Sequence, residues 1–207
     1  MTQKIRIAAL VSGRGTNLQA IVDGCRQGLI DGEVVLTITN RAQAGAVDRC
    51  RREGIPCLYV DNRRFSSRES FDAEVASTLR QARVDLVILA GFMRLLTPVL
   101  IRAFDGRIMN IHPSLLPSFP GLHPQQQAVD HGVRFTGCTV HFVDEGVDSG
   151  PIILQAVVPV LDDDNEESLR QRILHQEHIV YPQAIQLFAQ GRLKIEGRRV
   201  RILSSSG

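Results

Sequence analysis

Short apolar runs alternate with amphipathic stretches through the first half of the chain, and this alternation constrains the fold more than any other feature. The apolar runs are rich in Val, Ile and Leu and cover residues 5–11, 34–39, 56–60, 84–90 and 107–111. Such runs are typical of strands that are buried on both faces, as in a parallel sheet. Between them lie stretches with the pattern of helices, at residues 17–29, 44–53, 67–81 and 97–104. The alternation predicts an α/β fold with a doubly wound, mostly parallel sheet and helices on both faces.

A different pattern follows the fifth run. After a proline-rich loop, we expect a short helix, two strands that join the sheet in mixed directions and a long closing helix, at 124–131, 135–143, 152–160 and 166–190. Gly191 marks the end of the long helix, and the tail 204–207 is expected to be mobile. We expect a single domain over residues 1–207, with a Rossmann-like, phosphate-binding half at 1–111 and a closing half at 112–207.

The composition excludes several classes of function. Hydrophobic residues make up 43% of the 207 residues and charged residues 22%, as in an ordinary globular protein, and the formal net charge is +2. This charge argues against a broad nucleic-acid surface. The first apolar run is too short to span a membrane and carries no signal cleavage pattern. We therefore expect a cytoplasmic protein without nucleic-acid or membrane partners, acting as a monomer or homodimer.

Cysteine and histidine spacing gives no indication of a metal centre. The four cysteines are scattered, with no C-x-x-C spacing, at positions 25, 50, 57 and 138. This suits reduced thiols in a cytosolic enzyme better than a disulfide framework or a zinc site. A metal site that uses His112, His123, His141 or a cysteine is the alternative, but these residues lack tight ligand spacing. We expect no metal.

A glycine-containing loop, Ser-Gly-Arg-Gly-Thr-Asn at residues 12–17, joins the first strand to the first helix. Backbone amides at such a helix N-terminus favour an anion, so a phosphate is the expected ligand. A dinucleotide fingerprint would have a third glycine where Leu18 stands and an acidic residue near Asn40. No Lys-Ser/Thr follows as in a Walker loop. The loop therefore fits a phosphate monoester, and a tight turn without a ligand is the alternative.

Asn110, His112 and Asp148 supply the parts that acyl-type transfer to an amine needs. Asn110 and His112 are two residues apart at the end of the fifth strand, so both side chains project from one face. An Asn amide can hold a developing oxyanion, a His can carry a proton and an Asp can orient and charge that His. Each residue also has a structural interpretation: Asn110 and Asp148 as turn residues, and His112 as a hydrogen-bonded imidazole.

The chain resembles the phosphoribosylglycinamide formyltransferases over almost its whole length. The matching segments are residues 12–17, 89–94, 110–117, 120–123, 140–143, 148–151 and 176–178. The resemblance implies transfer of a formyl group from 10-formyltetrahydrofolate, as co-substrate, to the amine of glycinamide ribonucleotide in de novo purine biosynthesis. Both substrates are small molecules. It also implies that the closing half, 112–207, binds the folate.

The resemblance also assigns roles to residues. The implied catalytic residues are Asn110, His112 and Asp148. The residues implied to bind glycinamide ribonucleotide are Gly15, Thr16, Asn17, Leu174, His175, Gln176 and Glu177. Those implied to bind the folate are Arg68, Met93, Arg94, Leu95, Leu96, Asn110, Asp144 and Asp148. Thr16 stands where members of the family commonly have Ser, a change that keeps the backbone amide donor.

Other formyl enzymes share part of this pattern. The Asn-x-His and Asp-x-Gly-Pro elements also occur in formyltetrahydrofolate hydrolases and methionyl-tRNA formyltransferases, so the glycine loop and the chain length distinguish this subgroup. Hydrolases normally carry an extra N-terminal domain and the tRNA enzymes an extra C-terminal one, and the length of 207 residues favours neither. A different class is a non-catalytic NADP- or phosphosugar-binding module, in which Arg41 would meet a 2′-phosphate. The missing third glycine weighs against that module.

Overall fold

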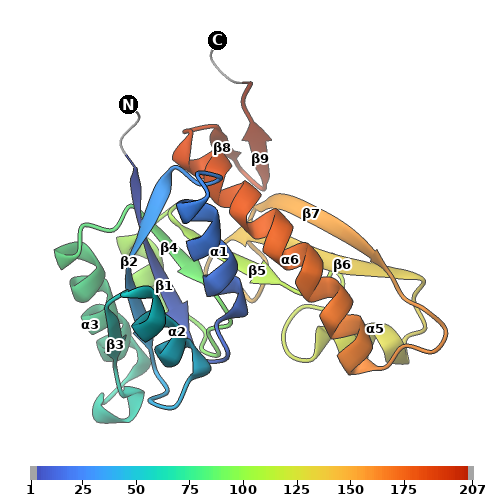
Figure 1. Ribbon diagram of the computed structural model, residues 1–207, viewed down its shortest axis with the longest axis horizontal. Helices are drawn as coiled ribbons and strands as arrows, with labels where there is room; N and C mark the ends of the chain where they lie inside the picture. Colours follow the sequence, from blue (N-terminus) through green and yellow to red (C-terminus); the bar gives the residue numbers. More distant parts are fainter. Residues whose placement is uncertain (1–3, 205–207) are drawn as a thin grey trace.

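A nine-stranded sheet forms the centre of the computed structural model, which describes residues 4–204 (Figure 1). The strand order is β3-β2-β1-β4-β5-β6-β7-β9-β8. The sheet continues across the boundary expected near residue 111, because that boundary falls inside β5 (Ile108–His112). Both halves of the chain therefore share one sheet.

The first five strands are parallel, as the hydrophobic pattern predicts. With β5, they are β1 (Ile5–Val11), β2 (Gly32–Thr39), β3 (Cys57–Tyr59) and β4 (Leu86–Leu89). The expectation that all five are buried on both faces is wrong for β3. This strand has only 3 residues at the edge of the sheet, and Leu58 and Tyr59 are 44% and 42% exposed. An edge strand has one neighbour, so solvent reaches its side chains.

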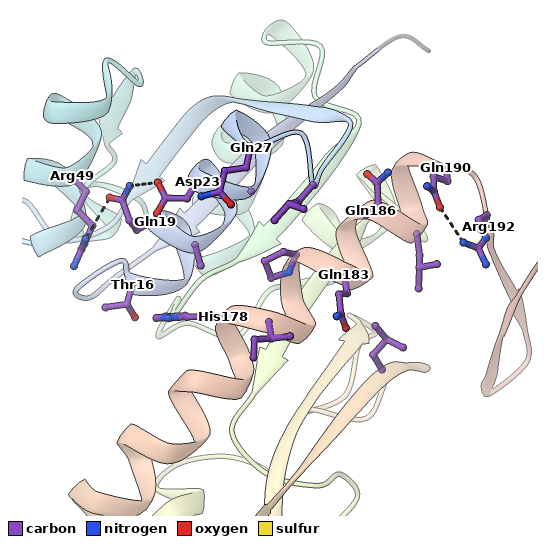
Figure 2. A pocket seen from close by; sticks show the side chains of 17 residues that line it. Thr16, Gln19, Asp23, Gln27, Arg49, His178, Gln183, Gln186, Gln190 and Arg192 are labelled. Carbon is purple, nitrogen blue, oxygen red and sulfur yellow. Dashed lines mark hydrogen bonds between the residues drawn. The ribbon is translucent and has the colours of Figure 1, made fainter. Parts of the chain in front are cut away.

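Helices cover both faces of the parallel region, which confirms the doubly wound arrangement. One core holds residues of α1 (Thr16–Arg26), α2 (Gly45–Glu53) and α6 (Glu166–Ala189) against the sheet. The other core holds residues of α3 (Arg68–Gln81) and α4 (Pro98–Ala103). Helices α1 and α6 lie side by side on their face although they come from opposite ends of the chain (Figures 1 and 2).

The second half adds strands in mixed directions, as expected. β6 (Phe135–Phe142) pairs antiparallel with β5, and β7 (Ile152–Pro159) pairs antiparallel with β6. The short helix α5 (Pro124–Asp130) precedes β6. Asn165 starts α6, because its side-chain oxygen accepts hydrogen bonds from the backbone amides of Glu167 and Ser168.

A C-terminal hairpin was not predicted from the sequence. It consists of β8 (Leu193–Glu196) and β9 (Arg199–Ile202), and β9 joins the sheet by a parallel pair between Ile152 and Arg199. A one-turn 3-10 helix, η1 (Asn62–Arg64), is the other unpredicted element. The expected mobile tail falls largely on residues 205–207, which lie outside the described residues.

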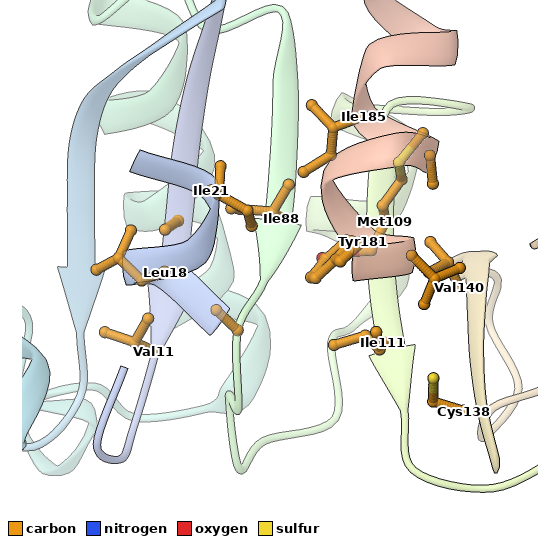
Figure 3. Packing of buried hydrophobic residues seen from close by; sticks show 14 of the residues in the cluster. Val11, Leu18, Ile21, Ile88, Met109, Ile111, Cys138, Val140, Tyr181 and Ile185 are labelled. Carbon is orange, nitrogen blue, oxygen red and sulfur yellow. The ribbon is translucent and has the colours of Figure 1, made fainter. Parts of the chain in front are cut away.

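Tyr181 joins α6 to the middle of the sheet (Figure 3). Its side chain is fully buried, and its hydroxyl lies 2.9 Å from the backbone oxygen of Met109 and 3.1 Å from that of Leu89. These two oxygens belong to the neighbouring strands β5 and β4. One hydroxyl therefore ties the last long helix to the two strands at the centre of the sheet.

Within residues 4–204, the helices are either too short or too polar to cross a membrane.

We predict that Tyr181→Phe lowers the free energy of unfolding by about 1–2 kcal/mol, because the change removes a buried hydrogen-bond donor and keeps the ring. Urea unfolding followed by circular dichroism would measure the loss. Tyr59→Phe is the matched control: Tyr59 is 42% exposed, so its change should stay within about 0.5 kcal/mol. Equal stabilities of the Tyr181→Phe variant and the wild type would contradict the role of the hydroxyl.

Candidate active site

The structure brings together the three side chains that the sequence singles out. Asn110 and His112 lie on β5, and Asp148 lies in the loop between β6 and β7. The Nδ1 atom of His112 is 3.3 Å from Oδ2 of Asp148, and Nδ2 of Asn110 is 3.4 Å from Oδ1 of the same carboxylate. One carboxylate therefore contacts both other members. Their role in catalysis stays a prediction.

These side chains face away from α6. Met109 and Ile111 belong to the core that contains α6, and residues alternate between the faces of a strand. Asn110 and His112 therefore project toward the face that carries α3 and α4, at the carboxyl end of β5. This end is where open α/β sheets bind their ligands.

The β6–β7 loop is shaped to return Asp148 to the sheet. Asp148 has a φ of 48°, a left-handed conformation that Asp adopts more easily than most residues. A Cβ on Gly150 would lie 1.8 Å from the backbone oxygen of Phe142, so only glycine fits there. The Asp144 carboxylate braces the loop by accepting hydrogen bonds from the Gly146 amide and the Ser149 hydroxyl, at 3.1 and 2.6 Å. Backbone shape and side-chain bonds together hold the Asp148 carboxylate in place.

His112 is buried, and both its ring nitrogens face hydrogen-bond acceptors. Nδ1 faces Asp148, and Nε2 lies 2.8 Å from the backbone oxygen of Phe119. The loop that carries Phe119 is itself held by Ser114, whose hydroxyl donates to the backbone oxygen of Ser118 at 2.6 Å. A substrate atom can therefore reach Nε2 of His112 only by taking the place of the Phe119 carbonyl.

A fourth side chain, His141, belongs to this cluster. The sequence places it in the matching segment 140–143 and allows it as a metal ligand, but assigns it no role at this site. It lies on β6 directly opposite Asn110 and is 2% exposed. Its Nε2 is 3.3 Å from Nδ2 of Asn110 and 3.7 Å from Oδ1 of Asp148, and its Nδ1 is 2.9 Å from the backbone oxygen of Phe142. Burial lowers the pKa of His141 below its ordinary value. Only the strand register brings this residue to the site.

The glycine loop has the geometry of an anion site. Gly15 precedes α1 with a φ of 72°, and a Cβ there would lie 2.8 Å from Cβ of Ala46. The loop is held against α2, because the Ala46 amide donates to the Gly13 oxygen at 3.1 Å and Arg49 Nε donates to the Arg14 oxygen at 2.8 Å. Because Gly15 has no side chain that could cap the helix, the first amides of α1 are available to a ligand.

Asn17 and Glu177 connect this loop to α6. Nδ2 of Asn17 donates to Oε2 of Glu177 at 2.7 Å. Glu177 is 6% exposed, and burial raises the pKa of its carboxyl above the ordinary value. The other three residues expected beside it, 174–176, cannot all face α1, because successive helical residues point in different directions. His175 is exposed, whereas Glu177 is in contact with the loop.

The segment expected to line the folate pocket, residues 93–96, is tied to the glycine loop and to α3. The Met93 amide donates to the Ser12 hydroxyl at 2.9 Å, and Arg68 donates to the Leu95 oxygen at 2.9 Å. The Arg94 guanidinium stacks over the Phe71 ring at 4.8 Å. The side chains of Met93 and Leu95 are exposed, whereas Leu96 packs against the core beneath. The segment thus presents apolar side chains at the same end of the sheet.

A groove of about 940 Å³ lies between α1 and α6 (Figure 2). Polar side chains along it come from α1, α2, α6 and the turn after α6: Thr16, Gln19, Asp23, Gln27, Arg49, His178, Gln183, Gln186, Gln190 and Arg192. The groove reaches the glycine loop at Thr16, but Asn110, His112 and Asp148 do not line it. The groove therefore lies on the face of the sheet opposite the cluster of Asn110, His112 and Asp148.

Residues 5–185 match the formyl transferase family. This match covers most of the chain, and the chain therefore belongs to the formyl transferase family, a family of enzymes.

Comparison with individual proteins shows which members of this family the chain is similar to. The chain is 44% identical to phosphoribosylglycinamide formyltransferase of Escherichia coli, covering 92% of this chain and 90% of the relative. It is 50% identical to the trifunctional purine biosynthetic protein adenosine-3 of Drosophila melanogaster, covering 90% of this chain but only 14% of that protein. The crystal structure of glycinamide ribonucleotide transformylase 1 from Symbiobacterium toebii is 58% identical with a TM-score of 0.97, covering 99% of this chain and 96% of that chain. The resemblance inferred from the motifs is confirmed.

We predict that Gly15→Ala lowers the free energy of unfolding by about 1–2 kcal/mol, because an L side chain is unfavourable at this φ and would also press on Ala46. Gly13→Ala is the matched control, because a Cβ on Gly13 would meet no atom within 4 Å. Urea unfolding would compare the two variants. Equal stabilities would show that the loop does not depend on the left-handed glycine.

We predict that Glu177→Gln makes the protein more stable, and that the gain grows as the pH rises above the ordinary Glu pKa of 4.5. A raised folded-state pKa means that the folded protein binds this proton more tightly than the unfolded chain. Ionisation at higher pH therefore destabilises the wild type, whereas Gln stays neutral and can still accept from Asn17. Unfolding measured from about pH 4 to 8 would test this. A gain that is independent of pH would contradict it.

Proposed function

We propose that the protein transfers the formyl group of 10-formyltetrahydrofolate to the amine of glycinamide ribonucleotide, giving formylglycinamide ribonucleotide and tetrahydrofolate. The observation that carries this proposal is the contact of Asp148 with both Asn110 and His112, at the same end of the sheet as the glycine loop. The names of the two relatives and of the crystal structure described above support the same substrate and a role in purine biosynthesis.

Glycinamide ribonucleotide would bind along the α1–α6 side of the site. The backbone amides of Gly15, Thr16 and Asn17 suit the phosphate, because they open the N-terminus of α1. Glu177 suits the ribose hydroxyls, because its buried carboxylate accepts hydrogen bonds and already holds Asn17. Leu174, His175 and Gln176 stay predicted contacts of this substrate.

The folate would bind on the opposite face, against residues 93–96 and the β6–β7 loop. Met93 and Leu95 offer exposed apolar surface for a flat ring. Arg68 and Arg94 are the cations expected near the acidic end of the folate. This assignment places the reacting atoms between the two substrates, at Asn110 and His112.

The transfer is direct. The amine lone pair forms a bond to the formyl carbon, and the carbonyl electrons move to the oxygen. Asn110 donates a hydrogen bond to that oxyanion, and His112 stabilises it after its Nε2 leaves the Phe119 carbonyl. When the carbonyl re-forms, the bond to the folate nitrogen breaks. That nitrogen takes the proton that the amine loses, through Asp148.

We propose small-molecule substrates only, a cytoplasmic location, and a monomer or homodimer. The unpaired state of Cys25, Cys50, Cys57 and Cys138 supports a reducing compartment. The proposed mechanism uses no metal ion.

We predict that His112→Ala and Asp148→Asn each lower kcat by about 10²-fold or more, while both substrates still bind, because these residues act on the reacting atoms. Steady-state kinetics with glycinamide ribonucleotide would measure this. Asp162→Asn is the control, because Asp162 is an exposed carboxylate in an ion pair with Arg134. Near wild-type turnover of either variant would remove the role assigned to that residue.

The acceptor is tested in the same assay by offering glycinamide ribonucleotide, charged initiator tRNA or water alone. We expect formyl transfer to the ribonucleotide and little to the other two. Faster consumption of formyltetrahydrofolate with water or tRNA would overturn the proposed substrate. Tight NADPH binding without any folate-dependent activity would overturn the enzyme class.

A further inference from the structure

The amide of Asn110 has to face the formyl oxygen with its nitrogen and not with its own oxygen. An Asn side chain can present either atom, because the two orientations have nearly the same shape. A wrong orientation would place the Asn110 oxygen against the developing oxyanion. The proposed reaction therefore requires that something select the orientation.

We propose that His141 is the positioning residue that selects it, by acting as a hydrogen-bond acceptor for the Asn110 amide. This inference rests on the proposed function, in which Asn110 is the oxyanion donor. His141 itself does not touch the reacting atoms. It acts through Asn110.

The tautomer of His141 follows from its backbone contact. Its Nδ1 lies 2.9 Å from the oxygen of Phe142, and a carbonyl oxygen can only accept. Nδ1 must therefore carry the proton. In a neutral ring, Nε2 is then left with a lone pair and acts as an acceptor.

This lone pair faces Asn110. Nε2 of His141 is 3.3 Å from Nδ2 of Asn110, and Oδ1 of Asp148 is 3.4 Å from the same atom. Both neighbours are acceptors, so an amide turned the other way would place oxygen against a lone pair and a carboxylate. Of the two acceptors, His141 is held in the more fixed position. It lies in β6 and is 2% exposed, whereas Asp148 lies in a loop and also contacts His112 and the Gly121 amide.

The arrangement leaves one amide proton for catalysis. Nδ2 of Asn110 carries two protons, and we assign one to His141. The other points to Asp148 across 3.4 Å. Both contacts are longer than an ordinary N–H···O bond, but Asp148 also contacts His112 and the Gly121 amide, so the proton that faces Asp148 is the one that can turn to a formyl oxygen. His141 thus holds the amide while its second proton remains usable.

Protonation of His141 would reverse this effect. The cation would direct an N–H from Nε2 at the N–H of Asn110, and it would draw Asp148, 3.7 Å away, out of its contact with the amide. The charged groups that face His141 are Asp148 and Asp144 from the β6–β7 loop and His112 from β5. Burial is the largest cause of its lowered pKa, so the ring is neutral at neutral pH and the loss of positioning belongs to the acid range.

The test uses two substitutions, alone and on an Asn110→Ala background. His141→Leu cannot accept a hydrogen bond, whereas His141→Gln can still accept with its side-chain oxygen. We expect His141→Leu to lower kcat by about 10–100-fold with little change in either KM, because the amide loses its preferred orientation. We expect His141→Gln to keep most of the wild-type kcat. Because Gln does not titrate, we also expect the fall of kcat toward acid pH to be smaller in this variant than in the wild type. On the Asn110→Ala background, His141→Leu should have no further effect.

Two measurements separate failure of the inference from failure of the proposed function. If Asn110→Ala strongly lowers kcat but His141→Leu turns over like the wild type, His141 has no positioning role while the function stands. If the wild type transfers no formyl group to glycinamide ribonucleotide, the function itself is wrong. Nitrogen NMR of the wild-type imidazole gives a readout besides activity: we expect the Nδ1–H tautomer, and an Nε2–H tautomer at neutral pH would overturn the inference even if His141→Leu failed to fold.

Discussion

The antiparallel pairing of β5 with β6 is the contact on which the site depends. It places His141 opposite Asn110 and Thr139 opposite His112. It also reverses the direction of the chain, which lets the loop after β6 fold back over β5 and deliver Asp148. The antiparallel pairing and the loop after β6 therefore bring His141 and Asp148 to Asn110 and His112.

Much of the fold follows from the hydrophobic pattern. The five parallel strands and the helices between them are predicted from the spacing of their apolar residues alone. The hairpin β8–β9 is not among the predicted elements because its strands contain no continuous apolar run. Lys194, Glu196, Arg199 and Arg201 alternate with apolar residues, and this alternation is itself typical of half-buried strands. The burial of β3 is misjudged for a related reason. A sequence shows how apolar a strand is but not whether it lies at an edge.

The candidate site is predictable to the extent that its residues are close in the chain. Asn110 and His112 lie on one strand, and the alternation of strand residues places them on one face. Asp148 is indicated by its loop and by the family motif. His141 is different, because its contact with Asn110 depends on the register between two strands, and a shift of one residue would point it to the other face. The contact of His112 with the Phe119 carbonyl is also set by loop geometry that the sequence does not reveal.

The hydrogen bond between Asn17 and Glu177 has a consequence for how the protein acquires its site. It joins residues 160 positions apart, so the α1 side of the contact is synthesised well before the α6 side. Contacts of such separation form only after a large loss of chain entropy, and they depend on the rest of the sheet being in place. The glycine loop can take its shape against α2 long before that point. Its partner on α6 is synthesised after β1 to β7, so the two sides of this contact meet only once those strands have been made.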